Sequence, residues 1–557
     1  MKRKISFLLL AAMIASLFAC TFSVDQPAEN GVPTISVAKI EGIPDNFLMG
    51  VDVSSLLSLE ASGRVFYGFH GSRQDVFKTL SQSGVNCIRV RVWNDPYDEN
   101  GNGYGGGNCT VDTVIELGRR AAQYGMGLLV DFHYSDFWAD PGKQQAPKAW
   151  QHITLDEKTE AIYQFTAQSI TKIRKSGIKI HMVQVGNEIT GGLCGEQEKA
   201  NMHQLLRAAA QAVRDTDSGI LVAVHYTNPE RRNYLEYARD LKQYGVDYDV
   251  FATSYYPEYH GTVHNLKEQL TAVHNFSGKK VMIAETSWDY TSSVVGAYKR
   301  SVQGQADEIA GCIQAMVDLG DFGIGVFYWE PAWIDVPGDD PEAILAKREA
   351  FGAGWASSYA GSYDPEDAGK YYGGTACIST ALFDPEGYPL ESLKTFLYVQ
   401  QGTNRKEHNY LKNPSFEDKT SAPWTIREAA PGTVSIQDKA ADAKDGSKSL
   451  HFWSEAPVDF TAEQTITDLP AGTYDFSLYV QGDGADSKAT LLIYAISDGV
   501  RYEKRFTLDG WLYWRVPVIE AIPCTNGSVT VGVRILAPPG TWGTVDHGEL
   551  IHTRQMQ

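Results

Sequence analysis

The 557-residue chain is short of positive charge and of cysteine. It has 49 Lys and Arg against 68 Asp and Glu, which gives a formal net charge of −19. A surface this acidic repels phosphate groups, so we expect no nucleic-acid partner and no direct attraction to anionic membranes. The seven cysteines include no CxxC pair and no metal-ligand spacing. We therefore expect most of them to be isolated buried thiols.

Long hydrophobic runs are also lacking beyond the N-terminus. Met1–Lys4 is a basic start, and Ile5–Phe18 is an apolar stretch that is too short to span a bilayer comfortably. This pattern is typical of a signal peptide over residues 1–20. The stretch ends in Leu17-Phe18-Ala19-Cys20, which resembles a bacterial lipobox. We expect Cys20 to be lipidated and the mature chain to be an exported bacterial lipoprotein, membrane-anchored at the cell surface or the periplasmic face through this lipid alone.

Internal repeats and low-complexity tracts are missing too, but a regular rhythm follows a polar spacer at residues 21–45. Between residues 46 and 400, short β-rich runs alternate with longer amphipathic stretches such as Val111–Tyr124. Such alternation favours a parallel sheet, because a crossover helix must return the chain to the same edge. Eight units predict an α/β domain, a (β/α)8 TIM barrel, with a doubly wound open sheet as the alternative. The eight runs are Phe47–Val53, Asn86–Trp93, Gly127–His133, His181–Asn187, Ile220–Tyr226, Tyr248–Tyr255, Lys280–Glu285 and Gly323–Trp329.

Polar or aromatic residues stand at the end of nearly every run, whereas the starts are apolar. Active sites of barrels lie at the C-terminal ends of the strands, so these endings predict one functional mouth. The endings are Asp52, Arg91 with Trp93, His133 with Asp136, Asn187 with Glu188, His225 with Tyr226, Tyr255 with Tyr256, Glu285, and Trp329 with Glu330.

Two of these endings carry glutamates, Glu188 after the fourth run and Glu285 on the seventh. In a closed barrel of eight strands, the fourth and seventh strands face each other across the mouth. Two facing carboxyl groups about 5–5.5 Å apart are what retaining glycoside hydrolysis requires, one protonated and the other ionised to attack the anomeric carbon. Asn187, directly before Glu188, is placed to bind a sugar 2-hydroxyl.

The chain resembles glycoside hydrolase family 53, the endo-β-1,4-galactanases. The resemblance covers residues 46 to 400 and rests on Gly50–Ser54, Arg89–Tyr97, Asn102–Asn108, Asp131–Asp136, Trp138–Pro141, Gly186–Ile189, Ala284–Trp288 and Phe327–Trp333. It implies endo-hydrolysis of galactan and type I arabinogalactan, with Glu188 as acid/base and Glu285 as nucleophile. It also implies substrate-binding roles for Asp52, Arg91, His133, Asp136, Trp138, Asn187, Tyr255, Trp329 and Trp333.

Physical roles follow for several residues around the two glutamates. An Arg near Glu285 would keep that carboxylate ionised, and a Tyr hydroxyl donating to it would do the same and orient it. Trp329 offers an apolar platform to a pyranose ring. Arg89, two residues before Arg91 on the same strand face, is expected deeper, in a buried structural ion pair.

No cofactor and no metal ion are expected. Some members of the resembled family bind calcium in an acidic loop after the seventh strand, but Trp288–Val295 of this chain holds only one carboxylate, Asp289. We therefore predict no metal site there.

After a linker at residues 401–410, the pattern changes to short alternating runs. Residues 411–557 show no long amphipathic stretch, which predicts an antiparallel β-sandwich. Leu411–Glu417 and Trp542–Gly548 resemble the opening and closing of galactose-binding-like jelly rolls, modules that often bind carbohydrate. The candidate platforms are Trp424, Trp453, Trp511, Trp514 and Trp542; the alternative is that most of them are core aromatics. The predicted runs are Ser449–Trp453, Gly472–Gln481, Ala489–Ile496, Tyr513–Ile519 and Ser528–Ile535.

Two other functions compete with galactan hydrolysis. A non-catalytic surface glycan-binding lipoprotein would not need both glutamates, and a clan relative that cleaves mannan or xylan would not share the motifs on six of the eight runs. We expect a monomer that acts on β-1,4-galactan and galacto-oligosaccharides.

Overall fold

The computed structural model describes residues 33–374, 377–403, 408–418 and 420–555. The predicted signal peptide and Cys20 lie outside the described residues. No helix in the described part of the chain is long and apolar enough to cross a bilayer. All six cysteines after Cys20 are free and buried, as expected for isolated thiols.

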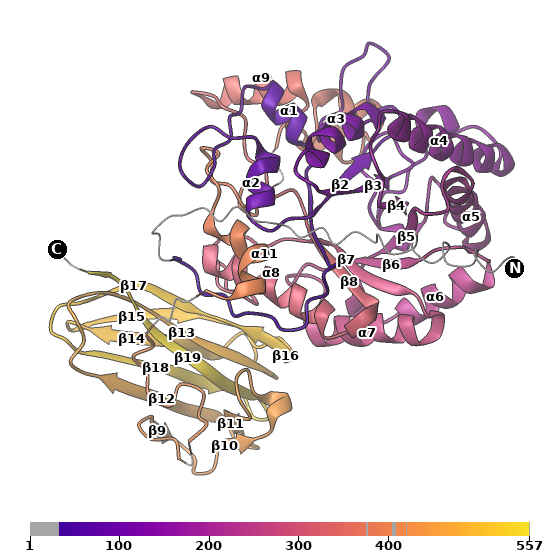
Figure 1. Ribbon diagram of the computed structural model, residues 1–557. Helices are drawn as coiled ribbons and strands as arrows, with labels where there is room; N and C mark the ends of the chain where they lie inside the picture. The colour runs from indigo at the N-terminus through magenta and orange to yellow at the C-terminus, as the bar shows by residue number, and fades with distance from the viewer. Residues whose placement is uncertain (1–32, 375–376, 404–407, 419, 556–557) are drawn as a thin grey trace, which may run out of the picture. The chain divides into compact units, whose positions relative to one another are not determined.

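Eight parallel strands close into a barrel, which confirms the (β/α)8 prediction over the open sheet. Each strand pairs with the next, and β1 also pairs with β8. Figure 1 shows the helices wrapped around this ring of strands. The strands are β1 (Leu48–Asp52), β2 (Cys87–Val92), β3 (Gly127–Phe132), β4 (Met182–Val185), β5 (Leu221–Tyr226), β6 (Val250–Ser254), β7 (Lys280–Thr286) and β8 (Gly323–Tyr328).

Amphipathic helices cover the barrel, and their ends carry capping residues. Helix α4 (Leu155–Lys175) begins with a capping box in which Thr154 and Glu157 satisfy each other's backbone N–H groups. Helix α7 (Val263–Ser277) ends at Gly278, whose φ of 70° is left-handed and suits glycine. The other helices are α1 (Leu56–Ala61), α2 (Val76–Gln82), α3 (Val111–Ala122), α5 (Lys199–Thr216), α6 (Tyr234–Gln243), α8 (Val302–Val317), α9 (Pro341–Phe351), α10 (Ala368–Tyr371) and α11 (Thr395–Gln401).

The barrel interior is apolar at its base and charged above it. Residues such as Cys87, Leu129 and Met182 form a buried apolar layer inside the ring. Two positions further along β2 and β3, alternation places Arg89 and Asp131 on the same inner face, where they form an ion pair. A polar layer thus lies next to the apolar layer, toward the C-terminal ends of the strands.

A bulge in β7 sets the direction of Glu285. Thr253 of β6 pairs with Ile283, but Ser254 pairs with Glu285, so Ala284 is an extra residue on β7. A bulge re-aims the side chains that follow it. Ala284 belongs to the interior layer and Glu285 also faces inward, whereas Thr286 turns outward and donates its hydroxyl hydrogen bond to Glu308 of α8.

After β8 the chain makes a long loop, the β8 excursion (residues 330–374), which includes α9, the short 3-10 helix Ser358–Ser362 and α10. Its residues Ala356, Ala360 and Tyr363 pack on Trp93 and Phe137 from the loops after β2 and β3 in a separate buried cluster. The excursion is therefore packed beside the mouth of the barrel.

The C-terminal part of the chain forms two antiparallel sheets around one core, which confirms the predicted sandwich. One sheet has the order β10-β11-β19-β13-β16, with β17 also on β13, and the other β15-β14-β18-β12-β9. The strands are β9 (Thr425–Glu428), β10 (Val434–Asp438), β11 (Lys448–Trp453), β12 (Val458–Ile466), β13 (Gly472–Asp483), β14 (Thr490–Ser497), β15 (Val500–Arg505), β16 (Gly510–Arg515), β17 (Val518–Cys524), β18 (Val529–Ala537) and β19 (Trp542–Gln555).

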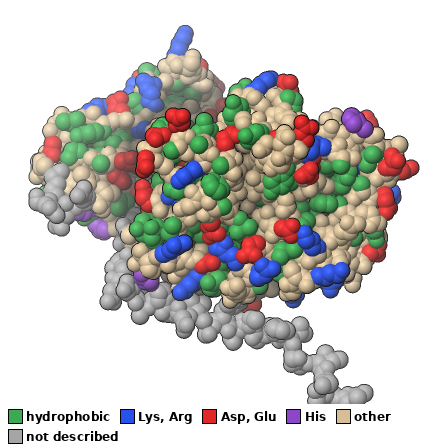
Figure 2. Space-filling view, turned by 90° about the horizontal axis from the view of Figure 1, so that it is seen from above, with side chains coloured by type: hydrophobic (Ala, Val, Ile, Leu, Met, Phe, Trp, Pro, Cys, Tyr) green, Lys and Arg blue, Asp and Glu red, His purple; other side chains and the backbone are tan. Residues whose placement is uncertain are grey.

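The sandwich differs from the prediction in its details. The expected run Tyr513–Ile519 is split between β16 and β17, and the predicted runs do not include β9, β10, β12, β15 or β19. Trp424 is buried in the core, whereas Trp453 and Trp511 are 47% and 46% exposed. The face of the molecule in Figure 2 carries interspersed acidic and basic side chains, so the negative net charge is not gathered there into one patch.

Candidate active site

Glu188 lies just beyond β4 in a tight turn. Its φ of 46° is left-handed, and its side-chain Oε1 accepts a hydrogen bond of 2.6 Å from the Ser254 hydroxyl. His225 is 2.9 Å from the same hydroxyl through Nε2, and its Nδ1 accepts from the Glu188 backbone N–H. Burial, and then the charge of Glu285, raise the pKa of Glu188. The site thus favours a protonated Glu188, as a general acid requires.

Glu285 has a more strongly polar setting at the end of β7. Its Oε1 lies 2.8 Å from a guanidinium nitrogen of Arg89, and its Oε2 accepts a 2.9 Å hydrogen bond from the Tyr256 hydroxyl. Burial raises the pKa of Glu285, while the Arg89 charge and the Tyr256 hydrogen bond oppose that rise. Two donors, one of them charged, stabilise the ionised carboxylate that a nucleophile needs.

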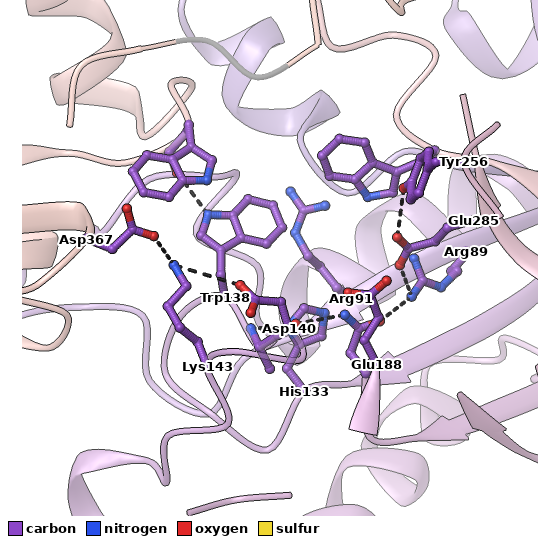
Figure 3. A pocket seen from close by; sticks show the side chains of 14 residues that line it. Arg89, Arg91, His133, Trp138, Asp140, Lys143, Glu188, Tyr256, Glu285 and Asp367 are labelled. Carbon is purple, nitrogen blue, oxygen red and sulfur yellow. Dashed lines mark hydrogen bonds and ion pairs between the residues drawn. The ribbon is translucent and has the colours of Figure 1, made fainter. Parts of the chain in front are cut away.

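Both glutamates line one cavity of about 270 Å³ at the mouth of the barrel. Figure 3 shows Glu285 beside Arg89 and Tyr256, Asp140 between Glu188 and Lys143, and Trp138 on the side of the cavity away from Glu285. The cavity lining consists of Arg89, Arg91, His133, Trp138, Ala139, Asp140, Lys143, Asn187, Glu188, Tyr256, Glu285, Trp329, Trp355 and Asp367.

Both arginines of β2 line the cavity, Arg91 as expected and Arg89 in addition to its expected ion pairs. Arg89, expected in a structural ion pair, binds Asp52 and Asp131 but also contacts Glu285 directly. Arg91, expected to frame the sugar, bonds Glu330 at 2.6 Å and lies over the Trp138 ring, 4.4 Å from its centroid. Arg89 rather than Arg91 therefore supplies the charge beside Glu285.

His133 and Asn187 line the cavity, as expected, and both are fixed by hydrogen bonds. His133 Nε2 lies 3.1 Å from Asp131, and its Nδ1 accepts from the Trp93 indole N–H at 3.2 Å. Asn187 accepts from Arg89 at 2.8 Å and donates to the Ala139 carbonyl at 2.9 Å. Both side chains are therefore oriented before any substrate enters.

Trp138 and Trp329 also line the cavity, but four expected substrate-binding residues do not. Trp333 is fully buried behind Trp138 and stacks on it, with its indole N–H donating to the Ala353 carbonyl. Asp52 is buried in its ion pair with Arg89.

The other two are Asp136 and Tyr255. Asp136 is buried and accepts hydrogen bonds from the backbone N–H groups of Asp95 and Lys148. Tyr255 donates its hydroxyl to the Gly261 carbonyl at 3.1 Å. These residues support the wall of the cavity rather than form it.

Besides Arg89, six cavity residues are not among the predicted site residues: Ala139, Asp140, Lys143, Tyr256, Trp355 and Asp367. Tyr256 was recognised as a strand ending, but residue order alone does not show which of two adjacent tyrosines faces the mouth. Trp355 and Asp367 belong to the β8 excursion, about which strand-end reasoning says nothing. Among the residues that the structure describes, no group of three or more His, Cys, Asp or Glu is arranged to hold a metal ion.

Known proteins resemble this chain in sequence and in fold. The model of glycosyl hydrolase family 53 matches residues 48–396. The chain is 49% identical over 423 residues to the endo-beta-1,4-galactanase of Bacillus subtilis, covering 72% of this chain and 99% of the relative. It is 33% identical over 370 residues to the arabinogalactan endo-beta-1,4-galactanase of Humicola insolens, covering 62% and 98%. The solved Ignisphaera aggregans GH53 catalytic domain matches with a TM-score of 0.58 and 34% identity, over 66% of this chain and all of that domain.

Proposed function

The chain belongs to glycosyl hydrolase family 53 and is a glycoside hydrolase; on that premise we propose that it cleaves internal β-1,4-galactosidic bonds of galactan and type I arabinogalactan, the side chains of pectin. The observation that carries the proposal is that Glu188 and Glu285 line one cavity with different partners. Glu188 accepts a hydrogen bond from a neutral hydroxyl, whereas Glu285 contacts a guanidinium group. The names of the two similar galactanases support the choice of galactan.

We propose a retaining mechanism with two displacements. Glu285 attacks the anomeric carbon while Glu188 gives its proton to the leaving glycosidic oxygen. The bond to the leaving sugar breaks and a glycosyl ester of Glu285 forms. Glu188, now ionised, takes a proton from water, which attacks the same carbon and frees Glu285. Arg89 and Tyr256 hold Glu285 in its ionised form before attack.

Sugar rings would be held by the aromatic and polar wall of the cavity. Trp329 and Trp138 contribute aromatic surface to the lining, and Asn187 is oriented for a hydroxyl next to the cleaved bond. A hydrogen bond to that hydroxyl strengthens as positive charge develops on the sugar ring in the transition state.

A product profile on linear β-1,4-galactan beside mannan, xylan and arabinan tests the proposal. We expect rapid loss of galactan chain length, with the first-formed reducing ends in the β configuration by NMR. Preferential cleavage of mannan or xylan would favour the clan-relative alternative. Binding of galactan without cleavage would favour the non-catalytic lipoprotein.

We further propose that the enzyme is an exported lipoprotein anchored through Cys20. The basic start and apolar stretch before Cys20 support this. Replacing Cys20 removes the site of all acyl chains, so Cys20→Ala is expected to leave the specific activity intact and to release the enzyme from membranes. Membrane fractions that retain the variant would contradict the proposal.

We propose glycan binding as a second function, carried by the sandwich. Trp453 and Trp511 are about half exposed on strands of the same sheet, and the Trp511 indole N–H is fixed by Asp442 at 2.8 Å. A second site on the chain raises the effective concentration of polymer near the cavity.

The test uses the full chain with Trp453→Ala and Trp511→Ala. Activity on polymeric galactan is expected to fall several-fold, with activity on short oligosaccharides unchanged. Val500→Ala, a change at an exposed apolar residue of the other sheet, is the matched control. Equal losses on polymer and oligosaccharide would point to a structural role for the two tryptophans.

A further inference from the structure

Lys143 stands where two walls of the cavity meet. It closes a four-residue turn in which Asp140 and Lys143 exchange two backbone hydrogen bonds of 2.9 and 3.0 Å. Its ammonium group binds Asp367 of the β8 excursion and lies 3.3 Å from Asp364 and 4.0 Å from Asp140. Figure 3 shows Lys143 between Asp367 and Asp140 at the edge of the cavity. No step of the proposed mechanism uses this cluster.

The same turn is tied to the general acid on its other side. The amide of Gln144 donates to the Asn187 carbonyl at 2.8 Å and to the Asp140 carbonyl at 3.0 Å. Asn187 directly precedes Glu188 in the chain. Residues 140–144 therefore connect the backbone beside the general acid to the β8 excursion. Gln144 makes the hydrogen bond to Asn187, and Lys143 makes the ion pairs with the excursion.

The excursion brings Trp355 into the cavity wall, and Lys143 lies beneath that ring. The ammonium nitrogen is 5.3 Å from the centroid of Trp355, within the range of a cation–π contact. The Trp355 carbonyl also accepts from the Trp138 indole N–H at 3.1 Å. The position of the Trp355 ring thus depends on how closely the excursion is held to the loop after β3.

Exposed ion pairs usually contribute little, but this cluster differs from them. The Lys143 side chain is 24% exposed and Asp364 11%, against 39% for Asp367 and 41% for Asp140, and one ammonium group serves all three carboxylates. Without the lysine, three negative side chains from two loops would face each other. Like charges at such distances repel, so loss of Lys143 would drive the loops apart rather than merely remove an attraction.

We propose that Lys143 is a positioning residue for the cavity: it binds Asp364 and Asp367 and so holds Trp355 in the wall that receives the sugar chain. This inference rests on the proposed galactanase function for its kinetic readout. Because Lys143 acts on the wall and not on the reacting atoms, its loss should weaken the binding of galactan and spare the chemical step.

Kinetics of the full-length enzyme on linear β-1,4-galactan test this. Lys143→Met is expected to raise KM about five- to tenfold with kcat within about twofold, and Asp367→Asn to raise KM less. The double variant should be no worse than Lys143→Met, because the second change removes one repelling charge. Lys143→Arg, which keeps the charge, should restore most of the affinity. Lys370→Met, which removes an exposed ion pair with Glu366 on the same excursion, is the matched control.

Two kinetic results would overturn the inference. One is an unchanged KM in Lys143→Met. The other is a KM that is raised in Lys143→Met and unchanged in Asp367→Asn, with a double variant whose KM shows the product of the two single effects. Lys143 would then act by contacting the sugar itself.

A measurement without substrate separates this inference from the proposed function. Tyr371 and Tyr372 are exposed chymotrypsin sites at the end of α10. Limited chymotryptic cleavage after these residues should be faster in Lys143→Met than in the wild type or in Lys370→Met. Wild-type enzyme that leaves galactan intact would refute the proposed function alone, and unchanged cleavage in Lys143→Met would refute the positioning role alone.

Discussion

The β7 side and the β4 side of the cavity each present one glutamate, but with opposite partners. Glu285 on β7 receives a guanidinium and a phenol hydroxyl, both within 3 Å. Glu188 beyond β4 receives one neutral hydroxyl, from Ser254. The same side chain is therefore stabilised as an anion on one side and left to hold a proton on the other. The two glutamates are thus distinguished by their neighbours and not by their own chemistry.

Removing either glutamate should have the largest effect and should separate the two sides. Glu285→Ala and Glu188→Ala are each expected to abolish nearly all galactan hydrolysis, since general acid catalysis alone is worth about 10²–10⁴-fold. Azide should rescue Glu285→Ala with an inverted glycosyl azide, because a small anion can attack from the opposite face. NMR of the product checks this. Wild-type turnover that gives the inverted anomer would contradict the two-step mechanism.

Replacing the two arginines of β2 should sharpen the contrast. The Arg89 charge lowers the pKa of Glu285, so Arg89→Met should raise that pKa. Because Glu285 must be ionised to attack, the acidic limb of the kcat/KM profile should move to higher pH, with a loss in kcat of about 10²-fold.

Arg91→Met is the control, since Arg91 pairs with Glu330 and leaves Glu285 alone. Both variants should melt earlier than the wild type, because each leaves buried carboxylates without their partner. The same displacement of the acidic limb in both variants would refute a specific role for Arg89.

The adjacent tyrosines offer a smaller and cleaner test. Tyr256→Phe removes a hydrogen bond to the Glu285 carboxylate and should lower kcat about tenfold, in line with the strength of hydrogen bonds to charged groups. Tyr255→Phe removes only a bond to the Gly261 carbonyl, so its kcat should stay within about twofold. A larger loss of kcat in Tyr255→Phe than in Tyr256→Phe would instead assign the role in the site to Tyr255, the residue expected from the sequence.

The smallest effect is expected on the β4 side. The Ser254 hydrogen bond favours the ionised form of Glu188, so Ser254→Ala should raise the pKa of Glu188 further. The general acid would then stay protonated to higher pH, and the alkaline limb of the pH–rate profile should move upward by less than about one unit. Thr253→Val is the control, because the Thr253 hydroxyl bonds Tyr234 rather than Glu188. A downward displacement of the alkaline limb in Ser254→Ala would contradict the assignment of Glu188 as the protonated general acid.

The barrel, the sandwich and the location of the two glutamates could be predicted from the amino-acid sequence. Those features depend on local patterns: buried parallel strands are continuous apolar runs, and the first polar residue after such a run lies at the mouth. Glu188 and Glu285 could be named for that reason, before any contact was known.

The neighbours of each glutamate could not be predicted in this way, because they depend on how the chain packs. The bulge at Ala284 turns Glu285 inward and Thr286 outward, and a one-residue change of register is invisible in the composition of a strand. Choosing Arg89 over Arg91 and Tyr256 over Tyr255 required the depth and direction of each side chain. Lys143 and Trp355 come from loops more than 200 residues apart in the chain. Their meeting follows from packing of the β8 excursion, because long-range contacts between loops leave no periodic signal in either segment.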